Sequence, residues 1–234
     1  YFDAAWDTYL AFCQPYDKVF DILRDTYLHA VERISHSFSH TGALFSPEAR
    51  LAEHLMVFYW QGKIDLKDPL LVAFWKRASD ELRAHAIEFI GRSLQQTPEE
   101  IPEEIIERLQ KLWDERITKA KSAPHEHARE MSAFGWWFIS GKFKTDWAIT
   151  QLEEALKIAP KTNPPEVIER LAEIAEIHPQ ESVECLKRIV DGDREGWTIL
   201  VRKEHIWKIL EAGLKHSEVQ KEAKDIVHYL GSRG

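Results

Sequence analysis

The sequence predicts an all-α protein, and three observations lead to this fold class. Apolar residues recur at helical spacing in successive stretches along the chain, and no stretch shows the alternation of a β-strand. Prolines and capping residues divide these stretches into helices of ordinary length. An aromatic helix end also recurs further along the chain. We therefore expect an α-solenoid of about five irregular, HEAT-like helical hairpins behind an N-terminal helical cap.

We expect one domain over residues 1–234, with the cap in residues 1–45 and the hairpins in residues 46–234. A proline in the first turn of a helix loses no hydrogen bond, so prolines mark candidate helix starts. Six prolines stand at such places: Pro47, Pro69, Pro98, Pro124, Pro165 and Pro179. The apolar stripes between them predict hairpins at roughly 47–78, 79–122, 124–158, 164–191 and 197–230.

Capping residues support several of these boundaries. Ser46 and Asp68 precede prolines and are candidate N-caps, and Thr97 stands three residues before Glu100, as in a capping box. Glycine accepts the left-handed conformation that ends many helices. Three glycines stand where a predicted helix ends: Gly62, Gly141 and Gly192.

The recurring aromatic helix end, which we call the internal echo, lies around two of these glycines. The stretch 58–64 (FYWQGKI) resembles the stretch 137–143 (WFISGKF) at an offset of 79 positions. Two steps of about 40 residues suit HEAT-type repeats, which have periods of roughly 40–47 residues. The echo therefore favours stacked hairpins over a globular helical bundle, which is the alternative fold.

Composition narrows the classes of function. The formal net charge of −8 argues against a nucleic-acid-binding protein, which needs a basic face. No apolar run approaches the length that spans a membrane. Two distant cysteines indicate a reducing compartment, so we expect a cytoplasmic protein. The chain starts without methionine, and we expect a piece of a longer polypeptide.

Two features invite a metal. The loop Asp191–Glu195 places acidic residues at positions 1, 3 and 5 of an EF-hand-like pattern, with Gly196 at position 6. Arg202 stands at position 12, where a bidentate glutamate should be, so a pair of helix caps explains the loop better. Eleven histidines, among them His36 and His40, leave a metal-dependent hydrolase as the alternative function, although no HExxH spacing is present.

Adjacent aromatic residues on one helix point about 100° apart, so a single narrow face cannot bury all of them. Inter-repeat packing explains most of these rings, and an exposed ring would be an anchor for a partner. The expected protein-binding residues are Tyr59, Trp60, Trp137 and Lys142.

From about residue 133 the chain resembles known repeat proteins. The segments that carry the likeness are Gly135-Trp136-Trp137-Phe138, Ser140-Gly141-Lys142-Phe143, Asp146-Trp147-Ala148, Asp191-Gly192-Asp193 and Gly196-Trp197. They resemble the C-terminal HEAT-like or TPR-like arrays of large bacterial multidomain proteins. In those proteins the arrays follow an NTPase or a sirtuin-like effector domain, some of them in antiphage defence. The resemblance implies an interaction or sensor module and no catalytic residues.

The sequence as a whole therefore predicts a non-enzymatic scaffold without a cofactor. Its expected partner is a protein or a peptide, or another domain of the same parent chain.

Overall fold

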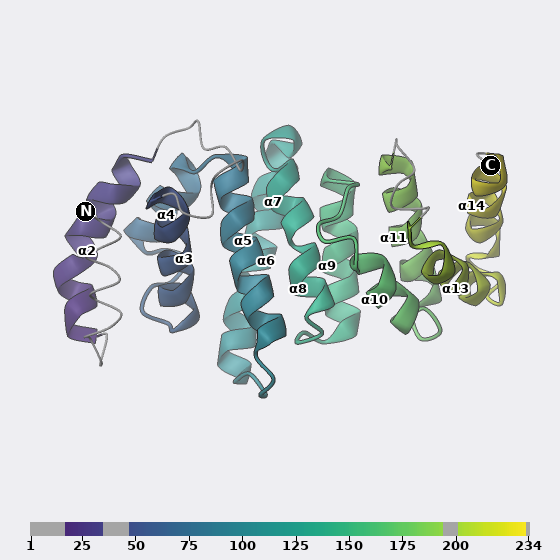
Figure 1. Cartoon of the computed structure of the whole chain (residues 1–234), viewed down its shortest axis with the longest axis horizontal. Coiled ribbons are helices and arrows are strands. Elements are labelled where there is room, and N and C mark those ends of the chain that lie inside the picture. The colour runs from purple at the N-terminus through teal and green to yellow at the C-terminus, as the bar shows by residue number, and fades with distance from the viewer. Residues whose placement is uncertain (1–16, 35–46, 194–200, 233–234) are drawn as a thin grey trace.

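The computed structural model describes residues 17–34, 47–193 and 201–232, and every regular element in these ranges is a helix (Figure 1). The all-α prediction is confirmed for this part of the chain. The elements, in chain order, are α2 (Asp17–Glu32), α3 (Pro47–Trp60), α4 (Pro69–Arg77), α5 (Asp80–Gln96), α6 (Glu103–Ser122), the short 3-10 helix η2 (Pro124–Glu126), α7 (Ala128–Ala133), α8 (Gly135–Ile139), α9 (Thr145–Ile158), α10 (Val167–Ile174), α11 (Pro179–Gly192), α13 (Lys203–Leu214) and α14 (Gln220–Ser232).

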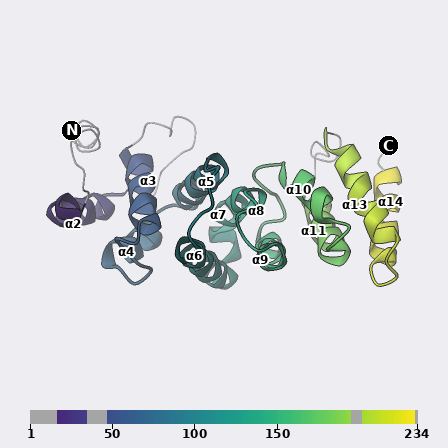
Figure 2. The ribbon, with the colours of Figure 1, turned by 90° about the horizontal axis from the view of Figure 1, so that it is seen from below.

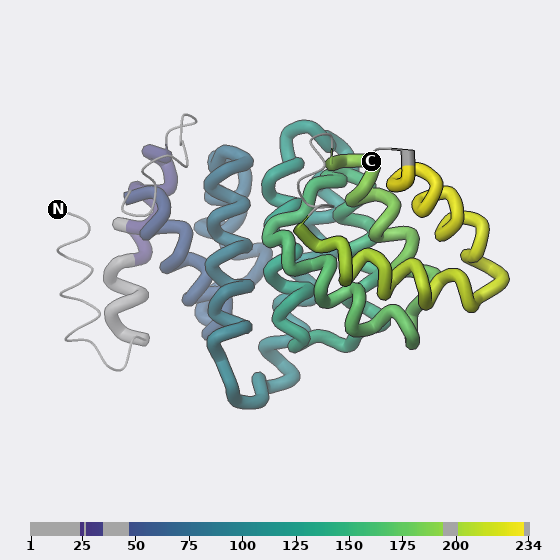
Figure 3. Tube along the Cα trace, turned by 45° about the vertical axis from the view of Figure 1, so that its right-hand side comes forward, coloured from purple at the N-terminus to yellow at the C-terminus, as the bar shows by residue number. Residues whose placement is uncertain are grey.

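The helices follow one another along the long axis of the molecule from the N-terminal to the C-terminal end (Figures 1 and 3). Seen from below, α3, α5 and α8 lie in one row and α4, α6 and α9 in a second row (Figure 2). Helices of one row pack on each other, as α3 does on α5, α6 on α9 and α9 on α11. The apolar core lies between the rows and extends from α2 to α14.

Local signals place several helix starts correctly. Pro47, Pro69 and Pro179 each begin a helix, as expected. Asp68 caps α4, because its Oδ1 accepts the backbone N–H of Leu70 at 2.9 Å. These features depend on a few neighbouring residues, which explains why the sequence alone identified them.

The expected helix start at Pro98 is wrong. Thr97 instead ends α5, since its N–H donates to the carbonyl of Ser93 at 3.1 Å and its hydroxyl donates to the same carbonyl at 2.8 Å. Residues 97–102 form a loop, and α6 begins at Glu103. A threonine hydroxyl can satisfy a helix carbonyl as well as an amide, so the same residue type marks both ends of helices.

The hairpin expected at 124–158 does not start with one continuous helix. Its first part is divided into η2, α7 and α8, with a break at Phe134. The loop before α10 packs on this break, where the N–H of Asn163 donates to the carbonyl of Ser132 at 3.2 Å. A Cβ atom on Gly135 would lie 2.6 Å from the carbonyl oxygen of Asn163. The close approach of a segment nearly thirty residues away therefore requires the glycine.

The two echoed glycines end helices, as expected. Gly62 has φ +73° and Gly141 has φ +66°, both in the left-handed region. After α3, the N–H of Lys63 donates to the carbonyl of Phe58 at 2.9 Å. After α8, the N–H of Gly141 donates to the carbonyl of Phe138 at 3.3 Å. An arginine of a later helix faces each glycine. These are Arg108 in α6 and Arg170 in α10.

The largest aromatic cluster among the described residues joins α6 to the segment from α7 to α9. Trp113 lies in its centre, stacked on Phe134 with ring centroids 4.9 Å apart and edge-on to Trp137 at 5.8 Å. The indole N–H of Trp137 donates to a carbonyl of α5 at 2.7 Å. The members of the cluster are Trp113, Phe134, Trp137, Phe143 and Trp147.

A buried ionic cluster joins α5, α6 and α7. The carboxylate of Glu130 in α7 has no exposed surface, and the Nε atoms of Arg83 and Arg116 donate to it at 2.7 and 2.5 Å. The Nδ1 atom of His127 lies 2.7 Å from Oε2. Burial alone raises the pKa of a carboxyl group, but the His127 contact and both guanidinium charges outweigh it and lower the pKa of Glu130 to about 2.

Every charge of this cluster has a partner. Asp80 at the start of α5 accepts the backbone N–H groups of Arg129 and Glu130 at 2.8 and 3.0 Å, so it caps α7 from another helix. Arg83 also donates to the carbonyl of Ala78 at 2.5 Å. The cluster therefore holds α5, α6 and α7 in register and leaves no charge for a ligand.

Candidate protein-interaction groove

Burial removes two of the four expected binding residues. Trp137 is 0% exposed and Tyr59 is 1% exposed, so neither ring can contact a partner. Trp137 belongs to the central aromatic cluster. The hydroxyl of Tyr59 donates to the carbonyl of Arg108 in α6 at 2.6 Å, and burial raises its pKa above the ordinary value. The assignment of these two residues as anchors is wrong, because helices on both sides cover them.

The other two expected residues stay at the surface in part. Trp60 ends α3 and is partly buried, and its carbonyl accepts Nη1 of Arg108 at 2.9 Å. Lys142 follows the left-handed Gly141, and its ammonium group donates to the carbonyl of Glu99 at 3.1 Å. Lys142 lines a groove and Trp60 does not. The structure therefore separates the two residues, and only Lys142 lies at a candidate site.

The groove lies between the α5–α6 loop, the first two turns of α6 and the turn that joins α8 to α9. The loop between α5 and α6 is at the lower edge of the molecule in Figure 1. The groove has a volume of about 680 Å³. Its lining residues are Pro98, Glu99, Glu100, Ile101, Glu103, Ile106, Glu107, Gln110, Gly141, Lys142 and Lys144.

Local sequence explains how α6 forms one wall. The stripe that contains Leu109, Leu112 and Trp113 is buried in the core. A second stripe at i, i+3, i+4 and i+7 lies on another face of the same helix and lines the groove. Its members are Glu103, Ile106, Glu107 and Gln110. The opposite wall depends on Gly141, whose left-handed turn brings Lys142 and Lys144 to the groove.

The two walls carry opposite charges. Four carboxylates line the α6 side, and none of them takes part in an ion pair found in the described part of the chain: Glu99, Glu100, Glu103 and Glu107. Lys142 and Lys144 lie on the other side. Partly buried Ile106 and the nearly buried Ile101 add apolar surface between the walls. This arrangement can bind a polar chain by charge pairing and shape, and it holds no nucleophile.

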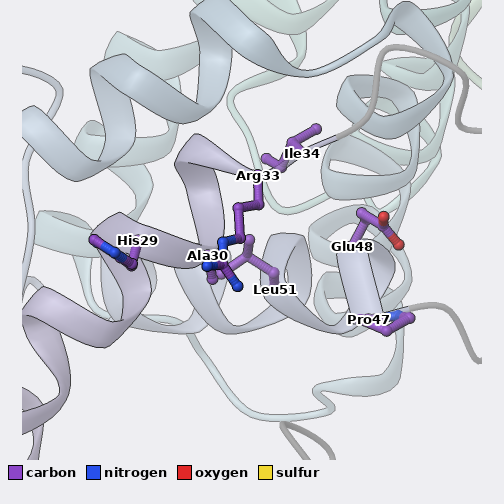
Figure 4. A pocket seen from close by; sticks show the side chains of 7 residues that line it. All are labelled: His29, Ala30, Arg33, Ile34, Pro47, Glu48 and Leu51. Atoms are coloured by element: carbon purple, nitrogen blue, oxygen red, sulfur yellow. The ribbon is translucent and has the colours of Figure 1, made fainter.

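A second cavity, of about 420 Å³, lies between the end of α2 and the start of α3 (Figure 4). Its lining residues are His29, Ala30, Arg33, Ile34, Pro47, Glu48 and Leu51. The chain that connects Ile34 to Pro47 lies outside the described residues, so nothing in the structure shows what covers this cavity.

The histidines do not form a metal site in the described part of the chain. No three His, Cys, Asp or Glu side chains converge there as metal ligands. His127 contacts Glu130 of the buried cluster, and His125 is exposed in η2. The pair His36 and His40 lies outside the described residues. The hydrolase alternative therefore gains no support from the residues that the structure describes.

The acidic loop Asp191–Glu195 lies only partly in the described ranges. Asp193 ends α11, where its N–H donates to the carbonyl of Ile189 at 3.0 Å. Residues 194–200, which include the rest of the loop, lie outside the described residues. The calcium-loop interpretation stays a prediction.

The sequence did not predict this groove. The spacing of Glu103, Ile106, Glu107 and Gln110 was visible as a second stripe. What the sequence could not show is that the α8–α9 turn lies opposite this stripe and leaves space between the two.

Comparisons of the chain with protein-family models, with curated proteins and with solved structures found no match. The resemblance to bacterial helical-repeat arrays therefore stays a prediction. Among the described residues, no helix combines the length and apolar content needed to cross a lipid bilayer.

Proposed function

We propose that this chain is a non-enzymatic protein-interaction module, built as an α-solenoid of five HEAT-like hairpins, and that the groove beside Lys142 is its binding site for a peptide segment of a partner protein. Support for the repeat arrangement comes from the packing of successive helices along the long axis, as α3 packs on α5, α5 on α7 and α8, α9 on α11, and α11 on α13. Support also comes from the matching ends of α3 and α8, where a left-handed glycine faces an arginine of a later helix.

The groove is the observation that carries the proposal. Helical-repeat proteins bind along surfaces made by successive units, and this groove is lined by elements of two successive hairpins. The ionic cluster around Glu130 is internally satisfied, whereas the groove has carboxylates without an ion pair in the described part of the chain and partly exposed apolar surface. Such a site fits an interaction module of the reducing cytoplasm better than it fits a catalyst.

A selection experiment tests this function. The purified chain is immobilised and a phage-displayed library of short random peptides is selected on it. The selected peptides are then tested against an Ile106→Ser variant, which removes apolar surface from the groove. Ile105→Ser is the matched control, because this neighbour on the same helix is also partly buried and does not line the groove.

The expected result is a set of peptides that lose binding with Ile106→Ser and keep it with Ile105→Ser, while circular dichroism shows both variants folded. A library without any peptide that depends on Ile106 would overturn the proposed function.

A further inference from the structure

We propose that two copies of this chain associate through the exposed face of α13, with the two helices antiparallel about a two-fold axis. The axis passes the helix at its midpoint, between Ile209 and Leu210. This inference goes beyond the proposed function, because no residue of α13 lines the groove beside Lys142. It follows from the exposed apolar side chains at α13, from the open side of this helix and from the order of its charges.

Exposed apolar side chains concentrate at α13. Among the described residues, four large apolar side chains are exposed, and three of them lie at this helix or beside it. Val201 just before the helix is 61% exposed, Trp207 within it is 40% exposed, and Ile177 between α10 and α11 is 78% exposed. Ile177 lies beside the end of α13, because its neighbour Glu176 accepts the ammonium group of Lys215 at 2.7 Å. Apolar side chains that gather at one place on a surface mark an interaction site.

One side of α13 has no cover in the described part of the chain. The helices α10, α11 and α14 pack on its other side, and Figure 2 shows α13 between α11 and α14. The buried residues of that side are Ile206, Ile209, Leu210, Ala212 and Gly213. Four exposed charged residues follow one stripe of the open side at i, i+4, i+7 and i+11. They are Glu204, Lys208, Glu211 and Lys215.

The charges of this stripe stay open within one copy. Glu204 and Lys208 are four residues apart, and so are Glu211 and Lys215, which is a spacing that allows ion pairs on a helix. No ion pair joins them in the described part of the chain, and Lys215 contacts Glu176 instead. These two side chains are 61% and 56% exposed, and an ion pair of such exposed groups contributes little. The stripe can therefore pair with charges of a second molecule.

The order of the charges indicates that this molecule is a second copy. Glu204 lies as far before the midpoint of α13 as Lys215 lies after it, and Lys208 and Glu211 flank the midpoint equally. In a two-fold interface, residue i of one copy meets residue j of the other, and j meets i. Antiparallel copies therefore place Glu204 opposite Lys215 of the second copy, twice. They place Lys208 opposite Glu211 of the second copy, also twice. A parallel pair would set each charge against itself, and like charges repel.

The same arrangement brings the apolar side chains together. The start of one α13 lies level with the end of the other, so Val201 of one copy comes next to Ile177 of the second copy. Trp207 lies less than one turn from the axis, so the two indole rings meet near the centre, where aromatic anchors contribute most. One helix face and its edges form a small interface, and small interfaces give weak, reversible association.

The test measures the mass of the chain by sedimentation velocity at concentrations from about 1 to about 300 µM, where weak dimers dissociate. Lys208→Glu and Glu211→Lys each place like charges opposite each other in a dimer of identical copies. A one-to-one mixture of the two variants restores opposite charges at both contacts of a mixed dimer. The matched control is Lys111→Glu mixed with Asp114→Lys, which makes the same charge changes at the same spacing on exposed sites of α6.

We expect the unchanged chain to dimerise at the higher concentrations and each single variant of α13 to dimerise at least about tenfold more weakly. Their mixture should regain the strength of the unchanged chain to within about threefold. Trp207→Ala should weaken the dimer about tenfold. The α6 variants, alone or mixed, should associate like the unchanged chain, and circular dichroism should show every variant folded.

A chain that stays monomeric over the whole range overturns the inference. A dimer that Lys208→Glu and Glu211→Lys do not weaken uses another surface, which overturns it as well. Weakening by both variants without recovery in their mixture would refute the antiparallel pairing. If either variant unfolds, Glu204→Lys mixed with Lys215→Glu tests the outer contacts in the same way. The peptide selection with Ile106→Ser is independent of these results, so the proposed function fails or stands separately.

Discussion

The buried carboxylate of Glu130 allows a quantitative prediction for the variant Glu130→Gln. This side chain is 0% exposed and lies between the guanidinium groups of Arg83 and Arg116, at 2.7 and 2.5 Å. Glutamine keeps the shape but removes the charge, and its amide N–H groups face other donors. Breaking a buried ion pair by removing one partner costs about 3–5 kcal/mol. A domain of this size has a total stability of roughly 5–15 kcal/mol, so the loss should be severe.

The assay is urea unfolding followed by circular dichroism, together with thermal unfolding. We expect the free energy of unfolding to fall by about 3–5 kcal/mol and the melting temperature to fall by roughly 6–20 °C. Glu154→Gln is the matched control, because Glu154 also contacts two cations but lies at the surface. Its loss should stay below about 1 kcal/mol. A similarly small loss for Glu130→Gln would refute the view that this cluster joins α5, α6 and α7.

The same variant gives a pH dependence. The pKa of Glu130 is lowered from 4.5 to about 2 in the folded chain, so its contribution to stability is fully present above pH 4.5. The contribution decreases as the pH falls towards 2, because the unfolded chain takes up the proton first. The difference in unfolding free energy between the unchanged chain and Glu130→Gln should therefore shrink by roughly 2 kcal/mol between pH 6 and pH 3. A constant difference over this range would contradict the lowered pKa.

Glycine substitutions test the packing and the helix ends. Gly91→Ala should lower the free energy of unfolding by about 1–3 kcal/mol, because the new Cβ would lie 2.4 Å from the Cβ of Trp136. Gly231→Ala meets open space, so it should raise the free energy of unfolding by up to about 1 kcal/mol in the same urea assay. Equal effects at both sites would contradict the close contact of α5 with α8. Gly62→Ala and Gly141→Ala should each lower the free energy of unfolding by about 1–2 kcal/mol, because both glycines have positive φ. Thermal unfolding should show the larger fall in melting temperature for Gly62→Ala, because the guanidinium group of the facing α6 arginine lies within 3 Å of the new methyl group. No loss at either position would mean that the left-handed caps are not needed.

The sequence by itself determined the all-α class and several helix boundaries, because these depend on neighbouring residues. Asp68 with Pro69 identifies the start of α4, and the glycines at 62 and 141 identify the ends of α3 and α8. Apolar residues at helical spacing made the helices themselves predictable.

A boundary fixed by a distant segment was not predictable, since the break before Gly135 exists because the loop at Asn163 packs on it. The threonine at 97 was misinterpreted for a local reason, because its hydroxyl donates to the carbonyl of Ser93 and so ends a helix instead of beginning one.

The candidate site was decided by the tertiary structure. The sequence placed Trp60 and Trp137 together among the expected binding residues, yet Trp137 is buried in the aromatic cluster and Trp60 is only partly buried. The stripe of Glu103 and Glu107 is visible in the sequence, but it becomes one wall of a groove only because the turn at Lys142 lies opposite. A helical pattern fixes which side chains share a face, and only the packing of several helices determines whether that face is covered, open or hollowed.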